Sequence, residues 1–269
     1  MERTIEQLRE QYEIEKELAG RLKNSPREER MHLYSSVYDE LYQRVPHHPQ
    51  LTRKQDPAKN LERLSKALKF IKLFLIKGAT VAEVGPGDCL FSFEMCKKAK
   101  KVYGVDVSKE ITKNKTAPEN FQLVISDGIS IPVPEGSINL IYSNQLMEHL
   151  HVEDAKEQLQ NIVKALAPNG QYVCVTPNRI NGPHDISKFF DKKATGFHLK
   201  EYTFTELKKL FLSVGFSSVS GYWGLKSLYF KVPNGIIYLA ETIISIFPFK
   251  IRRLKIFKPF LTIRIVGKK

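Results

Sequence analysis

The spacing of apolar residues along this chain follows two different periods, which separate helices from strands. In the stretch 61–76 the period is helical, with apolar residues at Leu61, Leu64, Leu68, Ile71 and Leu75. Short β-branched runs come next and predict strands at 80–84, 101–105, 122–125, 138–143 and 171–176. Helical segments separate most of these runs. Strands that alternate with helices predict an α/β fold built on a parallel, doubly wound sheet.

The pattern also predicts how the rest of the chain is organised. A helical arm and a polar link occupy residues 1–59, and the main domain runs from residue 60 to residue 269. Residues 177–203 form a polar loop expected to contact the substrate. Thr203 and Glu206 then have the spacing of a capping box, which begins a helix that ends at Gly215. Two last strands, at 216–223 and 261–266, enclose an insertion at 231–260.

Composition narrows the class of protein. The chain has 269 residues, of which 42% are hydrophobic and 26% charged, so it can bury a full core. Its three cysteines, Cys89, Cys96 and Cys174, have no metal-ligand spacing, and their odd number argues against a disulfide framework. The charged N-terminus has no apolar leader, and no apolar run reaches the roughly 18 residues of a membrane span. These features predict a cytoplasmic protein.

The positive charge of the chain is concentrated near its end. The net charge is +13, and residues 231–269 hold nine Lys or Arg residues against one acid, Glu241, which accounts for +8. Within this region, 249–260 alternates apolar and basic side chains. Two hypotheses follow for the insertion: a lid over the substrate, which we prefer, or a peripheral membrane segment at 233–260 with cations on anionic lipid.

Polar residues follow the predicted strands at the edge where α/β sheets bind ligands. Glu83 and the glycines of Gly85-Pro86-Gly87 end the first strand, and glycine lets a backbone approach a ligand closely. Asp106 ends the second strand, 19 residues after Gly87, where an acid can accept both hydroxyls of a ribose. Asp127-Gly128 follows the third strand and Asn144 the fourth. The set predicts a ligand that contains adenosine.

Two common nucleotide loops do not fit the glycine segment. A dinucleotide loop needs a third glycine three residues after Gly87, where this chain has Leu90. A phosphate-binding P-loop needs Gly-Lys-Ser/Thr, which is absent here. The acids Glu83 and Asp88 instead favour a ligand with positive charge and an amino-acid tail.

The residues 61–216 resemble the class I S-adenosylmethionine-dependent methyltransferases, of the broad group that includes ubiquinone-biosynthesis methyltransferases. The resemblance implies a Rossmann-like, mostly parallel sheet with an antiparallel last strand, and S-adenosylmethionine as cofactor. It assigns the cofactor's methionine part to Glu83, Gly85 and Gly87. It assigns the ribose to Asp106, adenine to Val107, and the adenine amino group to Asp127 beside Gly128. Glu148-His149 matches the frequent Glu-His after the fourth strand. One departure is Cys89, where the family has a third loop glycine.

Methyl transfer from a sulfonium needs an aligned acceptor and, for a hydroxyl, a base. Three histidines lie in segments expected above the strand ends: His184, preferred as the base, His149 and His198. We expect no metal, because the positions after the fourth and fifth strands read Ser143-Asn144 and Pro177-Asn178-Arg179 rather than acids.

The predicted activity is methylation of an oxygen or nitrogen of a small metabolite, natural product or glycan, without a metal. A lipid-linked acceptor at a membrane surface is an alternative substrate class. A nucleic-acid-binding protein, or a scaffold without activity, is an alternative function. Nucleic acid is not expected as a partner, because the basic residues lie among Ile and Phe rather than in a known binding module.

Overall fold

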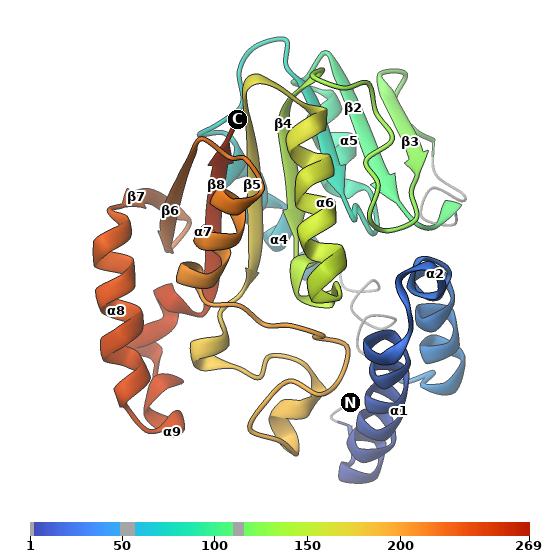
Figure 1. The fold of residues 1–269 in the computed structure, drawn as a ribbon, viewed down its shortest axis with the longest axis vertical. Helices are drawn as coiled ribbons and strands as arrows, with labels where there is room; N and C mark the ends of the chain where they lie inside the picture. The colour runs from blue at the N-terminus through green and yellow to red at the C-terminus, as the bar shows by residue number, and fades with distance from the viewer. Residues whose placement is uncertain (1–2, 49–56, 110–115) are drawn as a thin grey trace.

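A single eight-stranded sheet forms the centre of the computed structural model, which describes residues 3–48, 57–109 and 116–269 (Figure 1). The order across the sheet is β3-β2-β1-β4-β5-β8-β6-β7. The strands are β1 (Thr80–Val84), β2 (Lys101–Asp106), β3 (Phe121–Ile125), β4 (Ile138–Asn144), β5 (Leu166–Pro177), β6 (Ser218–Leu225), β7 (Leu228–Val232) and β8 (Thr262–Lys268). This arrangement confirms the predicted Rossmann-like fold class.

The first five strands are parallel, so their carboxyl ends meet at one edge of the sheet. β8 then pairs antiparallel with both β5 and β6. The sequence did not predict β7, which pairs antiparallel with β6. The turn between them places Lys226 and Ser227 at φ angles of 48° and 69°. Such hairpin turns are usually recognised by Asn or Gly at these positions, so this one carried no readable signal.

Helices cover both faces of the sheet because successive strand residues point to opposite sides. One face packs Ala82 and Ile141 against α6 (Val152–Ala165) and α7 (Phe204–Ser213). The other face packs Val81 and Leu140 against α4 (Pro57–Ile71) and α5 (Leu90–Cys96). Burial on both faces explains why these strands read as continuous apolar runs.

Two expected helix boundaries can be compared with the structure. The capping box before α7 is present, with Thr203 as N-cap and Glu206 as its partner. The helix expected at 61–76 runs instead from Pro57 to Ile71. Residues 72–74 form turns, and these carry Phe74 and Leu75 onto the same apolar cluster as α4.

The N-terminal arm is a pair of helices, α1 (Ile5–Asn24) and α2 (Arg27–Arg44), that contact each other near the carboxyl edge of the sheet (Figure 1). Buried residues of the arm join the core of the main domain: Leu18, Leu22, Val37 and Leu41. The arm is therefore part of the packed fold. Most of the expected polar link falls on 49–56, which lies outside the described residues.

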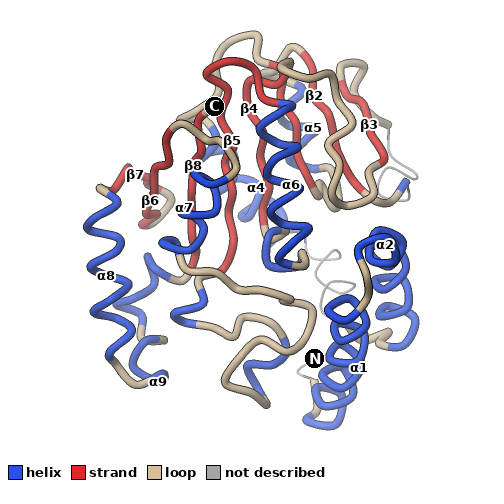
Figure 2. Tube along the Cα trace, viewed as in Figure 1, coloured by secondary structure: helices blue, strands red, loops and turns tan. Residues whose placement is uncertain are grey.

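The insertion is helical, whereas 177–203 is mostly loop with two short turns of 3-10 helix, η3 (Arg179–Asn181) and η4 (Ile186–Phe189) (Figure 2). The insertion contains α8 (Asn234–Ile246), α9 (Phe249–Arg252) and η5 (Lys255–Phe260). A short 3-10 turn, η2 (Met147–His149), follows β4. Among the described helices, none is long and apolar enough to cross a membrane.

Candidate active site

A cavity of about 480 Å³ lies at the carboxyl edge of the sheet, and several parts of the chain line it, α4 among them. The loop after β1 contributes Glu83, Gly85 and Gly87, and the segment after β4 contributes Asn144, Glu148 and His149. The loop 177–203 contributes His184, Asp185 and His198, and the arm contributes Gln11, Glu15, Tyr38 and His48. The structure thus brings all three predicted histidines to the same cavity as the glycine loop.

The other predicted cofactor residues are not on the wall of this cavity. Asp106, Val107, Asp127 and Gly128 follow β2 and β3, which are the next strands in the sheet. β1 and β2 are paired in register, with Val84 beside Val105, so Asp106 ends next to the glycine loop. This order matches the expected placement of the parts of an adenosine, and the individual roles stay predictions.

The glycine loop adopts the backbone conformation that favours glycine. Gly85 has φ of 72° and Gly87 has φ of 57°, both in the left-handed region. Cys89 has φ of 57° as well, and it is buried at the start of α5. The cysteine therefore holds a conformation that costs a non-glycine residue roughly 1–3 kcal/mol. The glycine common at this position in the family would avoid that cost.

Glu83 is a buried carboxyl at the end of β1. Its Oε2 accepts a hydrogen bond of 2.5 Å from the Ser92 hydroxyl. Burial raises the pKa of Glu83 to about 8, and the nearby charges of Asp88 and Asp106 act in the same direction. A cationic ligand at the loop would favour the ionised form of this carboxyl.

Asp106 and Asp127 both order the turns that follow their strands. Asp106 Oδ1 accepts from the Ser108 backbone N–H at 3.0 Å. Asp127 Oδ1 accepts from the Ile129 and Ser130 N–H groups at 2.9 and 2.6 Å. Burial alone would raise the pKa of Asp127, but these hydrogen bonds lower it on balance. Asp127 therefore stays ionised and has a second oxygen to offer a ligand.

Glu148 and His149 enter the cavity from η2. Glu148 is fully buried; its Oε2 accepts from the Thr176 hydroxyl at 2.8 Å, while its Oε1 has no hydrogen-bond partner among the described residues. Burial raises the pKa of Glu148 to about 7. His149 Nδ1 lies 2.9 Å from the Phe197 carbonyl oxygen, which can only accept, so Nδ1 carries the proton. Burial lowers the pKa of His149 to about 3, which leaves a neutral ring with Nε2 as an acceptor.

The other two histidines share Glu201. Its Oε1 lies 2.7 Å from His198 Nδ1 and accepts from the His184 backbone N–H at 2.7 Å. Burial alone would lower the pKa of His198, but the hydrogen bond to Glu201 and the surrounding carboxylates raise it on balance. His184 Nε2 donates to the Asn178 carbonyl oxygen at 2.8 Å, and burial lowers the pKa of His184. His184 is therefore neutral, with Nδ1 as its acceptor atom.

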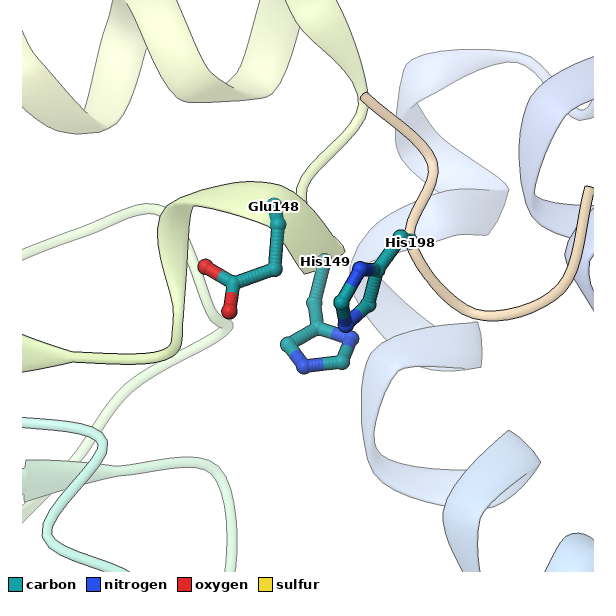
Figure 3. Close-up of side chains that lie close together, drawn as sticks. All are labelled: Glu148, His149 and His198. Atoms are coloured by element: carbon teal, nitrogen blue, oxygen red, sulfur yellow. The ribbon is translucent and has the colours of Figure 1, made fainter. Parts of the chain in front are cut away.

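Figure 3 shows Glu148, His149 and His198 close together, with the two histidines coming from different segments of the chain. One nitrogen or oxygen atom of each lies within 4.8 Å of the other two. The two imidazole rings meet edge to face with centroids 5.0 Å apart. The sequence predicted the histidines, and it named Glu148 only as a family feature.

The arm covers the cavity with residues that the sequence did not assign to the site. Tyr38 stacks on Phe197 at 5.0 Å between ring centroids and meets His149 edge to face at 6.1 Å. Glu15 accepts from the Phe197 N–H at 3.4 Å, and its Oε1 lies 3.4 Å from His48 Nε2. The contacts with Phe197 and His149 join positions more than a hundred residues apart, so no local sequence pattern predicts them.

Comparison with known families agrees with this geometry. A family model described as a methyltransferase domain matches residues 82–174, which run from β1 to β5. An S-adenosylmethionine-dependent methyltransferase of Mycolicibacterium smegmatis is 28% identical over 141 residues, which are 52% of either chain. The chain therefore spans about half the length of this relative. Phosphoethanolamine N-methyltransferase 1 of Triticum aestivum is 29% identical over 100 residues, 35% of this chain and 20% of the relative.

Solved structures with the same fold come from archaea and bacteria. A Haloferax volcanii methyltransferase, solved with the Trm112 activator, superposes with a TM-score of 0.58 at 17% identity, covering 80% of this chain and 93% of that one. An S-adenosylmethionine-dependent methyltransferase of Archaeoglobus fulgidus gives 0.54 at 21% identity, covering 77% and 94%. At such identities the likeness concerns the fold.

Proposed function

We propose that this chain, which belongs to the class I S-adenosylmethionine-dependent methyltransferases, transfers a methyl group to an oxygen or nitrogen of a small metabolite, natural product or glycan. The observation that carries the proposal is the shared cavity, where the glycine loop at Gly85 and Gly87 faces the same space as His149, His184 and His198. Its volume of about 480 Å³ lies within the range of small-molecule sites. The wheat relative suggests a nitrogen acceptor as one case.

S-adenosylmethionine supplies a methyl group that is already activated on a sulfonium. The residues of this chain then have to align the acceptor and receive its proton. We assign the proton to His184 Nδ1, because Nε2 is held as a donor by the Asn178 carbonyl oxygen. When bound, S-adenosylmethionine would give its methyl carbon to the acceptor's lone pair and keep the electron pair of the carbon–sulfur bond, and Glu83, Gly85, Gly87 and Asp106 would hold it. Tyr38 and Phe197 stack on each other in the cavity wall, so their rings would limit the access of water to it.

Cofactor binding is the first test of the proposal. Calorimetric titration should show S-adenosylmethionine binding to the wild-type chain, weakened about 10–100-fold by Asp106→Ala because the ribose hydroxyls lose a charged acceptor. Glu119→Ala is the matched control, since Glu119 is exposed just before β3, at the opposite edge of the sheet. Equal affinity in the wild type and Asp106→Ala would remove Asp106 from the ribose site.

The surface of the insertion supports a second proposal about where the acceptor is met. The helix α8 buries Ile237 and Ile244, and it exposes apolar side chains on its other sides, of which Ile246 is 77% exposed. The segment that follows α8 exposes further apolar side chains, of which Ile256 is 75% exposed. The exposed apolar residues of this insertion surface are Ile236, Tyr238, Leu239, Ile243, Ile246, Phe247, Phe249, Ile251, Leu254 and Ile256. So many exposed apolar side chains on one short segment favour an interaction site.

We propose anionic lipid as the partner of the insertion surface, and the charge of this region supports it. Residues 226–260 contain seven Lys or Arg residues and one acid, Glu241. Glu241 is buried and accepts from the Phe204 and Thr205 N–H groups at the start of α7, at 2.7 and 3.1 Å. It therefore anchors α8 to α7 and does not offset the positive charge at the surface. Each exposed cation near an anionic membrane contributes about 1 kcal/mol. A symmetric dimer through this face would place the same cations against each other.

The insertion surface is joined to the loop that carries His184. Arg253 donates to the carbonyl oxygens of Asn181 and Pro183 at 3.1 and 2.8 Å. None of the residues that line the cavity comes from 231–260, which favours membrane contact over the lid that we preferred from the sequence. Docking would bring a lipid-linked acceptor to a loop that contacts the docking segment directly.

Vesicle flotation tests the membrane proposal in the absence of acceptor. The chain should float with vesicles that contain phosphatidylglycerol, bind pure phosphatidylcholine weakly, and be released at 1 M salt, where the Debye length is about 3 Å. The variants Ile246→Asp and Ile256→Asp should reduce flotation. Ile5→Asp is the matched control, because Ile5 is 57% exposed on the arm, on the other side of the molecule from α8 (Figure 1). No flotation, or a stable dimer or protein complex that masks this surface, would overturn the proposal.

A further inference from the structure

One side-chain atom of each of Glu148, His149 and His198 is held by a hydrogen bond. Glu148 Oε2 accepts from the Thr176 hydroxyl at 2.8 Å, and His149 Nδ1 donates to the Phe197 carbonyl oxygen at 2.9 Å. His198 Nδ1 lies 2.7 Å from the Glu201 carboxylate. Carboxylate, carbonyl and hydroxyl partners of this kind orient the ligands of metal sites and fix the histidine tautomers.

Each of the three residues also keeps a side-chain atom that could serve as a metal ligand. These atoms are Oε1 of Glu148 and Nε2 of each histidine, for which no hydrogen bond is found within the described part of the chain. Glu148 is 0% exposed, and a buried carboxylate oxygen without a partner is costly. A bound cation would remove that cost, because it supplies the missing partner on the cavity side.

We propose that Glu148, His149 and His198 bind a divalent transition-metal ion on the wall of the active-site cavity. One ligand atom of each lies within 4.8 Å of the other two, and all three residues line the cavity (Figure 3). Two imidazoles and one carboxylate suit Zn²⁺, Mn²⁺ or Fe²⁺ better than Mg²⁺ or Ca²⁺, which prefer oxygen ligands alone.

Three protein ligands leave at least one coordination position for a small molecule. This position opens on the cavity, so the ion can take the acceptor's oxygen or nitrogen as a ligand and make a hydroxyl more acidic. His184 then receives the acceptor's proton as before. This role rests on the proposed methyl transfer, whereas the ion site itself does not.

The sequence predicted a site without a metal. That expectation rested on the absence of acids directly after the fourth and fifth strands, where a cage for a hard cation would have them. Glu148 lies four residues past the end of β4, and His198 follows β5 by 21 residues, beyond the loop turns η3 and η4. Only the folded loop brings His198 beside His149.

The test is metal binding by the full chain after chelator treatment. Calorimetry with Zn²⁺ and electron paramagnetic resonance with Mn²⁺ should each report one ion per chain. Thr176→Val, which keeps the side-chain volume but removes the hydroxyl, should weaken binding about 10–100-fold. Glu148→Gln and His198→Gln should weaken it further. His32→Gln is the matched control, because His32 is an exposed histidine of α2.

Titration with S-adenosylmethionine accompanies each metal titration. Cofactor affinity should stay near the wild-type value in Glu148→Gln and His198→Gln, which shows that these variants are folded. No stoichiometric ion in the wild type, or equal ion affinity in the wild type and both ligand variants, would overturn the metal site while cofactor binding stands. Loss of cofactor binding in the wild type would instead count against the proposed function.

Discussion

Arg30 on α2 and Asp154 on α6 form a buried, two-pronged ion pair that ties the N-terminal arm to the main domain. Arg30 Nε and one terminal nitrogen each lie 2.8 Å from a different oxygen of Asp154. The two side chains are 3% and 0% exposed. Tyr34 also donates to Asp154, at 2.7 Å, and its hydroxyl accepts from the His151 N–H. The pair therefore fixes the arm, which carries Tyr38 and Glu15 to the cavity.

Removing Asp154 should destabilise the protein strongly. In Asp154→Ala the Arg30 guanidinium stays buried without its main partner, so we expect a loss of about 3–5 kcal/mol in the free energy of unfolding, measured by urea titration. Glu157→Ala is the matched control between the same two helices. This variant removes the ion pair between Glu157 and Arg27. The side chains of Arg27 and Glu157 are 40% and 37% exposed, so the loss should cost less than about 1 kcal/mol. Similar losses in both variants would contradict this account.

Glu83 should make the stability of the ligand-free protein depend on pH. Burial raises the pKa of Glu83 to about 8 from an ordinary value of 4.5. Between these values the folded protein holds a proton that the unfolded chain has released, so stability is greatest below pH 4.5 and falls as the pH rises through about 8. Glu83→Gln, which cannot ionise, should lack this part of the fall.

Thermal unfolding from pH 5 to pH 9 measures the effect. The melting temperatures of the wild type and Glu83→Gln should diverge as the pH rises, with the variant becoming relatively more stable. Curves that stay parallel over this range would mean that Glu83 is already ionised in the folded state. Glu94→Gln, at an exposed ion pair of α5 with Lys97, is expected to leave the wild-type profile unchanged.

The sequence predicted the parts of the fold that depend on local pattern. The strands β1, β2, β4 and β5 could be located because burial on both faces gives continuous apolar runs, and the start of α7 because a capping box is a local signal. The order of polar residues after the strands was readable for the same reason: parallel strands bring their carboxyl ends together. Asp106 and Gly85 could therefore be assigned to one edge.

The remaining features depend on contacts between distant segments. The anchoring of the arm joins Arg30 to Asp154 across 124 residues, and neither position stands out locally. The sequence shows Cys89 only as a departure from the family's third loop glycine, and its φ of 57° identifies it as strained. His198 lies close to Glu148 only because of the path that the loop 177–203 takes. The sequence indicates that this loop is polar, but it does not predict the path of its backbone.

His184 is the group that we expect to receive the acceptor's proton. His184→Ala should lower kcat about 10²–10⁴-fold, because a positioned base contributes that much, while the affinity for S-adenosylmethionine stays near the wild-type value. His32→Ala should leave both quantities unchanged, since His32 is exposed on α2. The readouts are single-turnover methyl transfer and cofactor titration, measured on the same samples.

A second variant separates catalysis from structure at this position. His184 Nε2 donates to the Asn178 carbonyl oxygen, and its backbone N–H donates to Glu201, so truncation to Ala could also disturb the loop. In His184→Gln the amide N–H can still donate to Asn178, but no side-chain atom can take a proton near neutral pH. If His184 is the base, Gln should be as inactive as Ala. If Gln restores kcat, the residue positions the loop and the proton leaves by another route, which would withdraw His184 from the mechanism.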